Sequence, residues 1–195
     1  MPSALRRAGC LILCVPLLLA AILGVGFLLD RAVGEGVRTL YPRKYTDLVE
    51  KASTDYGVPA SIIYAVMRTE SNFRPDAVSH KDAVGLMQIT ADTYDWIYFL
   101  KGETADPDTL SVPAYNVDAG VYLLAWLYDY YGNWQTVYAA YNAGFSRVNS
   151  WLEDPEISAD GVLVNIPFAE TENYVRLVTA TAETYRSLYQ EEGLE

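Results

Sequence analysis

The most regular pattern in the chain is a repeat of apolar side chains every three or four residues, the spacing that puts them on one side of a helix. In residues 58–73 this repeat includes Ile63 and Val66, and Pro59 suits a first helical position. Glu70 falls on or beside the same apolar stripe, where a carboxylate is costly to bury. Two interpretations stay open: an edge carboxylate that reaches water or a nearby arginine, or a partly desolvated acid with a raised pKa.

Similar repeats predict further helices downstream. They cover residues 44–56, 91–100, 116–131, 134–142, 145–152 and 169–190. Gly57 is placed to end the helix over residues 44–56, and Asn133 is placed to cap the helix over residues 134–142. Loops are expected over residues 82–90, 101–113 and 153–165, the first with a short strand as the alternative. The pattern therefore predicts an all-α domain of six or seven helices.

The first thirty residues differ from the rest. Residues 8–29 contain no charged side chain, and such a run is long enough to span a bilayer with some tilt. Arg6 and Arg7 precede it, which favours a cytoplasmic N-terminus and an external domain. A cleaved signal peptide is the alternative, although its apolar region is usually shorter. We expect a stub and single-pass membrane anchor over residues 1–29, a link over 30–40, the helical domain over 41–190 and a tail over 191–195.

Composition narrows the function. The net charge of −11 argues against a nucleic-acid partner, which usually meets a basic face. Cys10 and Cys14 lie in the apolar run and His80 is the one histidine, so a cysteine-based or histidine-rich metal site, a thiol nucleophile and a Ser-His-Asp triad are disfavoured. Sixteen tyrosines and four tryptophans fit either core packing or a sugar-binding cleft, and composition does not choose between them.

Several short motifs follow one another along the predicted domain. They are Glu70-Ser71, Gly85-Leu-Met-Gln88, Asn116 with Gly120, Ala140-Tyr-Asn-Ala-Gly144, Ile166-Pro167, Glu170-Thr171 and Tyr174-Val175. Each is weak alone, but together and in this order they resemble the catalytic domain of lytic transglycosylases of the soluble lytic murein transglycosylase (SLT) type. The resemblance covers about residues 45–188 and implies an all-α, goose-lysozyme-like fold.

The resemblance also implies roles for individual side chains. Glu70 would be the single catalytic acid and base, and Tyr141 would hold its carboxyl group. Supporting and substrate-binding residues would be Ser71, Ser79, Met87, Gln88, Asn142, Glu170 and Tyr174. Most of them have a plain structural alternative: a core tyrosine, an amide that satisfies backbone groups, or a glutamate favoured by a helix dipole. No metal site and no cofactor is expected.

Ordinary glycosidases use two carboxylates, and the sequence offers one well-placed acid. Asp76 and Asp82 lie in turn-like segments, where aspartate commonly bonds backbone groups. One acid suffices if the 6-hydroxyl of the substrate's muramic acid attacks the anomeric carbon, which gives a 1,6-anhydro product. We therefore expect a membrane-anchored lytic transglycosylase on the cell-wall side, with peptidoglycan strands as its partner. A lysozyme-type hydrolase and a non-catalytic glycan-binding module are the alternatives.

Overall fold

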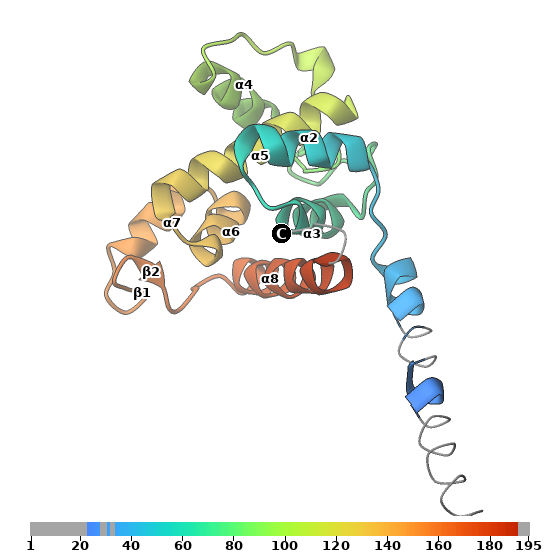
Figure 1. Cartoon of the computed structure of the whole chain (residues 1–195). Coiled ribbons are helices and arrows are strands. Elements are labelled where there is room, and N and C mark those ends of the chain that lie inside the picture. The colour runs from blue at the N-terminus through green and yellow to red at the C-terminus, as the bar shows by residue number, and fades with distance from the viewer. Residues whose placement is uncertain (1–22, 28–30, 32–33, 191–195) are drawn as a thin grey trace, which may run out of the picture. The chain divides into compact units, whose positions relative to one another are not determined.

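The computed structural model describes residues 23–27, 31 and 34–190, and the chain divides into two units between Pro42 and Arg43 (Figure 1). In the first unit, residues 34–40 are helical. Among the described residues no helix is both long and apolar enough to cross a membrane. The predicted anchor over residues 8–29 falls mostly outside the described residues, so it stays a prediction. The tail over residues 191–195 also lies outside them.

The second unit follows the apolar repeats of the sequence closely. Its α-helices are α2 (Thr46–Tyr56), α3 (Ala60–Ser71), α4 (Ala91–Leu100), α5 (Pro113–Tyr131), α6 (Trp134–Ala143), α7 (Phe145–Leu152) and α8 (Ala169–Tyr189). A short 3-10 turn, η1 (Pro107–Thr109), and a hairpin of β1 (Ser158–Ala159) and β2 (Val162–Leu163) lie in the connecting segments. Most residues of this unit are therefore helical, as the periodicity predicts.

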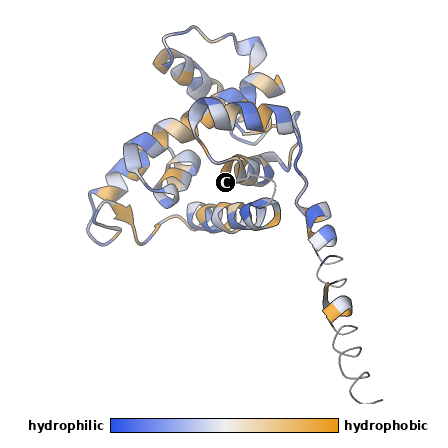
Figure 2. Cartoon of the chain, viewed as in Figure 1, coloured by the Kyte–Doolittle hydropathy of each residue, from blue (hydrophilic) through white to orange (hydrophobic). Residues whose placement is uncertain are grey.

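The helix α3 is the centre of the core. Its side chains from Ala60 to Met67 are all buried, and it packs mainly against α8, beside which it lies in Figure 1. The rings of Tyr64 and Tyr185 stack between these two helices, with centroids 5.2 Å apart. Figure 2 shows apolar and polar positions alternating around the helices, as expected where one face of each is buried. The helix that carries Glu70 is thus fixed along most of its length.

The caps predicted at Gly57 and Asn133 are confirmed, and α3 and α5 begin at other residues than predicted. Gly57 ends α2 in the left-handed conformation, and the Asn133 side chain caps α6 by accepting from Thr136 N–H. Pro59 is the N-cap of α3 and not its first helical residue. Pro113 is the first residue of α5, which therefore begins three residues earlier than predicted, because proline's missing N–H is harmless there.

The segment 153–165 is not only a loop. β1 and β2 pair antiparallel across a turn in which Asp160 and Gly161 both have positive φ, 51° and 76°. Aspartate followed by glycine is the typical dipeptide of such a turn, so the sequence did contain a signal for this hairpin.

Candidate active site

The carboxyl group of Glu70 lies at the end of α3, where the buried face of the helix stops. Asn72 and Phe73 follow with positive φ, 50° and 62°, so the chain turns sharply away from the helix axis. The hydroxyl of Ser71, which is buried, lies 2.8 Å from the Leu86 carbonyl oxygen and 3.1 Å from that of Met67. This contact ties the end of α3 to the segment that follows Gly85. Ser71 therefore supports the site as a structural residue.

One side chain from α8 holds the Glu70 carboxyl group. The hydroxyl of Tyr174 donates a hydrogen bond of 2.6 Å to Glu70 Oε1. Burial raises the pKa of Glu70 from its ordinary 4.5 to about 7, against the opposing effect of the Tyr174 hydrogen bond, which favours the charged form. The sharper of the two interpretations of Glu70 is the one that the geometry supports: a half-buried acid with a strongly raised pKa.

The place expected for Tyr141 needs correction. Its hydroxyl donates to the Met87 carbonyl oxygen at 2.8 Å, whereas the hydrogen bond to Glu70 comes from Tyr174. Tyr141 is still close enough to the acid to feel its charge. Burial raises the pKa of Tyr141, and the charge of Glu70 raises it further. The two tyrosines come from different helices: Tyr141 on α6 bonds the backbone of the segment 84–89, and Tyr174 on α8 bonds the acid at the end of α3. Tyr141 thus shapes the neighbouring loop.

That loop is held by Asn116 on α5, whose side chain is fully buried. Its Oδ1 accepts from the Met87 N–H at 2.8 Å, and its Nδ2 donates to the carbonyl oxygens of Val84 and Leu110 at 2.9 and 3.0 Å. Gly85 makes room for it, because a Cβ there would lie 2.6 Å from Asn116 Nδ2. In the sequence, Asn116 with Gly120 is one of the ordered motifs that carry the family resemblance.

Met87 and Gln88 turn out to build the loop. Met87 has no exposed surface and packs on Gly120, where an added Cβ would lie 2.5 Å from its sulfur atom. It therefore cannot be a direct substrate contact in this conformation. Gln88 has a positive φ of 50°, and its Nε2 donates to the carbonyl oxygens of Ala77 and Gly85. The side-chain amide of Gln88 thus satisfies backbone groups, which is the structural alternative to substrate binding.

Two further expected residues bond groups of the protein itself. Ser79 Oγ accepts from the backbone N–H groups of Lys81 and Ala83, so it shapes a turn in the loop after α3. Asn142 Oδ1 accepts from the hydroxyl of Thr171 at 2.8 Å and joins the end of α6 to the start of α8.

One exposed ion pair joins the loop after α3 to α8. Glu170 is exposed, one helical turn before Tyr174, and its Oε1 lies 3.8 Å from Lys81 Nζ. Asp76 and Asp82 are exposed in turns, and neither takes the place of a second buried acid. Within the described part of the chain, no three His, Cys, Asp or Glu side chains form a group that could hold a metal ion.

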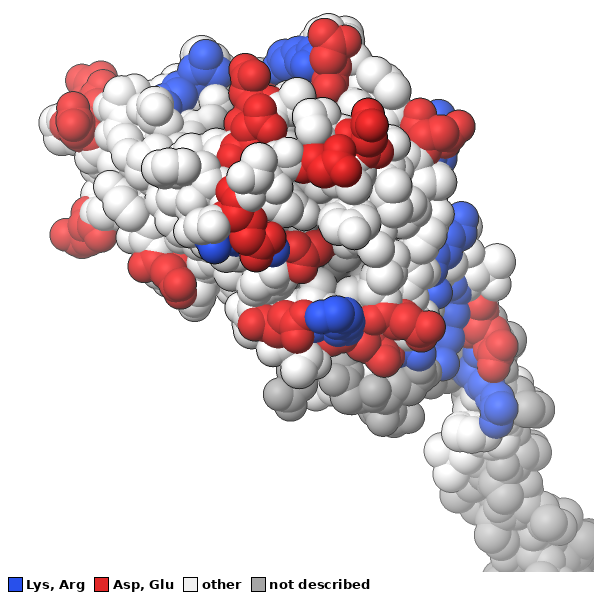
Figure 3. Space-filling view, turned by 90° about the horizontal axis from the view of Figure 1, so that it is seen from above, with Lys and Arg blue, Asp and Glu red and all other residues white. Residues whose placement is uncertain are grey.

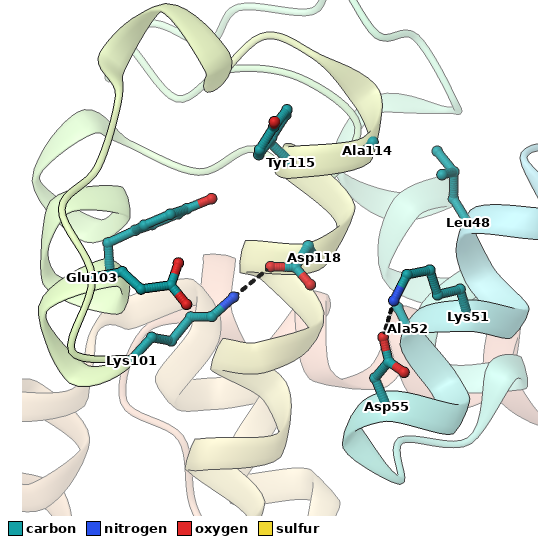
Figure 4. A pocket seen from close by; sticks show the side chains of 10 residues that line it. Leu48, Lys51, Ala52, Asp55, Lys101, Glu103, Ala114, Tyr115 and Asp118 are labelled. Carbon is teal, nitrogen blue, oxygen red and sulfur yellow. Dashed lines mark hydrogen bonds and ion pairs between the residues drawn. The ribbon is translucent and has the colours of Figure 1, made fainter.

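A separate cavity of about 310 Å³ lies between α2, α4 and α5 (Figure 4). None of the expected site residues lines it. Four of its five charged side chains form ion pairs, Lys51 with Asp55 and Lys101 with Asp118 at 2.7 Å, and the fifth is Glu103. Lys101 also lies 5.3–5.8 Å from the centres of three tyrosine rings. These contacts fix the segment after α4 to α5 and give the cavity a structural role.

Comparison with known proteins places this geometry in a family. The family model of the transglycosylase SLT domain matches residues 47–162. The membrane-bound lytic murein transglycosylase C of Sodalis glossinidius is 33% identical, over 78% of this chain and 46% of that protein. The protein of the same name from Salmonella typhimurium is 32% identical, over 73% of this chain and 46% of its own length. The chain thus spans about half the length of the curated relatives that it matches.

Solved structures agree with the sequence comparisons. The 70 kDa soluble lytic transglycosylase of Escherichia coli superposes with a TM-score of 0.69 at 31% identity, over 77% of this chain and 25% of that one. The complex of a 70 kDa soluble lytic transglycosylase with bulgecin A gives a TM-score of 0.70 at 33% identity, with the same coverage. The lysozyme-like helical fold that the motifs implied is therefore confirmed.

Proposed function

The chain belongs to the transglycosylase SLT domain family, and we propose that it is a peptidoglycan lytic transglycosylase. It would cleave the β-1,4 bond between N-acetylmuramic acid and N-acetylglucosamine. The observation that carries this proposal is the state of Glu70 at the end of α3. Its carboxyl group is half-buried, has a pKa of about 7 and accepts a hydrogen bond from Tyr174 on α8. At neutral pH about half of such groups are protonated, so the acid that the reaction needs is available.

The first step is proton transfer from Glu70 to the glycosidic oxygen. The bond from this oxygen to the anomeric carbon of the muramic acid breaks, and the electron pair leaves with the oxygen. Burial makes the charged form of Glu70 costly. The carboxyl group therefore keeps its proton until the leaving oxygen can accept it. The Tyr174 hydroxyl, at 2.6 Å, then stabilises the carboxylate that remains.

The second step uses the same group as a base. The Glu70 carboxylate takes the proton of the muramic acid 6-hydroxyl as that oxygen attacks the anomeric carbon. The product is a 1,6-anhydro sugar, no water is consumed, and Glu70 ends as it began, protonated. General acid–base catalysis of this kind contributes about 10²–10⁴-fold in rate. No second carboxylate and no cofactor is required.

The other residues would serve this acid in two ways. Ser71, Asn116, Met87 and Gln88 hold the loop beside it, and Tyr141 fixes that loop through the Met87 carbonyl. Glu170 is exposed and lies 3.8 Å from Lys81 of the turn that Ser79 shapes, and we propose that Glu170 and this turn contact the sugar chain. Asn142 supports the start of α8 through Thr171. These roles remain proposals that mutation tests one at a time.

The location proposed for the enzyme is the cell-wall side of the membrane. Relatives that match this chain are named membrane-bound, and residues 8–29 carry no charge. We propose that these residues form a single-pass anchor, with the domain from about residue 41 outside the cell. Alkaline carbonate should leave the full chain in the membrane pellet, and release by this treatment would contradict the anchor.

The test of the activity is a cleavage assay on purified peptidoglycan. The wild-type protein should release soluble fragments, and the Glu70→Gln variant should release none while it keeps its fold and its affinity for glycan. Glutamine preserves the shape of the side chain and can still accept the Tyr174 hydrogen bond, so a loss of activity reports on the proton. If the activity of this variant were close to that of the wild type, the result would contradict the single-acid mechanism.

A further inference from the structure

We propose that Lys81 is a specificity-determining residue of this site, whose ammonium group binds a free carboxylate on the peptide stems of the substrate. The inference rests on the proposed function and deepens it. It concerns a residue outside the motifs that carry the family resemblance. Four observations support it: the turn that presents Lys81, its partner on α8, the weakness of that pairing, and the charge of the rest of the molecule.

The turn holds the lysine at its tip. Ser79 Oγ accepts from the N–H groups of Lys81 and Ala83 at 3.2 and 3.1 Å, and Ser79 N–H donates to the Ala83 carbonyl at 2.9 Å. On either side of this turn, Val78 and Val84 form an antiparallel bridge. The backbone of Lys81 is therefore well fixed, although its side chain is 64% exposed.

The side chain of Lys81 reaches the first turn of α8. Its Nζ lies 3.8 Å from Oε1 of Glu170, in the first turn of α8. Glu170 and Tyr174 are four residues apart, which places them on one face of α8 about 6 Å apart along its axis. Tyr174 bonds the catalytic carboxyl. The ammonium group therefore lies next to a residue one helical turn from the tyrosine that bonds Glu70.

The pairing with Glu170 is weak enough to be exchanged. Both side chains are mostly exposed, 64% and 73%, and the two atoms are 3.8 Å apart. Exposed ion pairs of this kind contribute little stability. A carboxylate on the substrate can therefore replace Glu170 as the partner of Lys81 at small cost. Glu170 is then released to accept hydrogen bonds from sugar hydroxyls.

The overall charge makes such a contact valuable. The chain carries a net charge of −11, and acidic side chains are spread over the face of the molecule seen in Figure 3. A glycan with free carboxylates on its peptide stems is repelled by this field. Other cations beside the site have protein partners: Arg74 Nε donates to the Ser71 carbonyl, and Arg147 donates to the Ala143 carbonyl and lies over the Phe168 ring. Lys81 is the cation best placed to offset the repulsion.

The experiment compares two glycan fragments with identical sugars, one with free stem carboxylates and one with the same groups amidated. Dissociation constants are measured by calorimetry in the full-length Glu70→Gln protein, with and without Lys81→Ala. Cleavage rates are measured with Glu70 intact. Lys81→Ala should weaken binding of the free-carboxylate fragment about two- to fivefold and leave the amidated one unchanged. Lys81→Arg should restore the preference, and 0.5 M salt should abolish it.

A matched control is Lys51→Ala, which removes an exposed lysine from an ion pair on α2, away from the site. It should change neither dissociation constant. Equal weakening of both fragments by Lys81→Ala, or no effect on either, would overturn the inference while normal cleavage left the proposed function standing. A Lys81-dependent preference without any cleavage by the protein with intact Glu70 would overturn the proposed function alone. Failure to bind either fragment, together with no cleavage by the protein with intact Glu70, would overturn both.

Discussion

Glu70 shows how much one residue depends on its surroundings. Its position in the helical repeat fits an edge carboxylate and a partly desolvated acid equally well. Periodicity does not say which other segments of the chain cover the end of a helix. In the folded chain the end of α3 packs against α8, and burial raises the pKa of Glu70 to about 7. The hydroxyl that lies within reach belongs to Tyr174, 104 residues further along the chain. Only the tertiary structure could decide that pairing.

The role of Tyr174 is open to a pH test. Its hydrogen bond lowers the pKa of Glu70, so Tyr174→Phe should raise this pKa further. With Glu70 acting first as an acid, kcat/KM should be level from pH 5 to 6 and fall above about pH 7. Tyr174→Phe should shift this fall to higher pH and lower the plateau about tenfold, measured by fragment release. Tyr141→Phe, the control, should lower the rate more modestly without moving the fall, because its hydroxyl bonds Met87.

The raised pKa of Glu70 also predicts a change in stability with pH. Between pH 4.5 and 7 the unfolded chain ionises this group while the folded chain keeps it protonated, so the wild type loses stability as pH rises. Glu70→Gln lacks this loss. The variant should therefore gain up to about 3 kcal/mol over the wild type by pH 8, relative to their difference at pH 4. Urea unfolding at both pH values measures it, and a difference that is independent of pH would mean that the acid is not desolvated.

At the level of secondary-structure elements, the loop from Val84 to Ile89 depends on Gly85. Gly85 has a φ of 83°, and a Cβ there would meet the Asn116 amide at 2.6 Å. Gly85→Ala should therefore cost about 3–4 kcal/mol of folding stability, the sum of backbone strain and a clash with a buried group. Gly132→Ala is the matched control, since φ is 69° and nothing lies within 4 Å of the added Cβ.

Chemical denaturation separates the two effects. The control should lose only the conformational part, about 1 kcal/mol. Equal losses at Gly85 and Gly132 would show that the Asn116 contact does not constrain the loop. The Gly85 variant should also lose activity beyond its loss of stability, because Ser71 is bonded to the same loop.

The elements themselves were largely predictable. Apolar repeats located every α-helix from α2 to α8 within a few residues, because one buried face per helix leaves a regular trace in the sequence. The small hairpin was missed because two-residue strands carry no periodicity, although Asp160-Gly161 marked its turn. The sequence predicts the start of α5 at Asn116, three residues too late, because Pro113 also fits the loop that precedes the helix. These errors are local and do not reach Glu70.

At the scale of the whole molecule, the order of motifs predicted the family, and the matching family model and structures confirm it. Which motif residues touch each other was less predictable. Met87, Gln88 and Ser71 build the support of the site, and the contact from Lys81 to Glu170 was not foreseen. Hydrogen bonds between distant segments follow from packing angles that no local pattern encodes.

The central claim is that Glu70 alone transfers the proton in both directions and that the substrate's own hydroxyl replaces water. Mass spectrometry of the fragments released from purified peptidoglycan tests it most directly, with Glu70→Gln as the blank. The proposed mechanism predicts muramic acid ends in the 1,6-anhydro form, one water lighter than a reducing end. Released fragments with ordinary reducing ends, one water heavier, would contradict it and identify a hydrolase on the same fold.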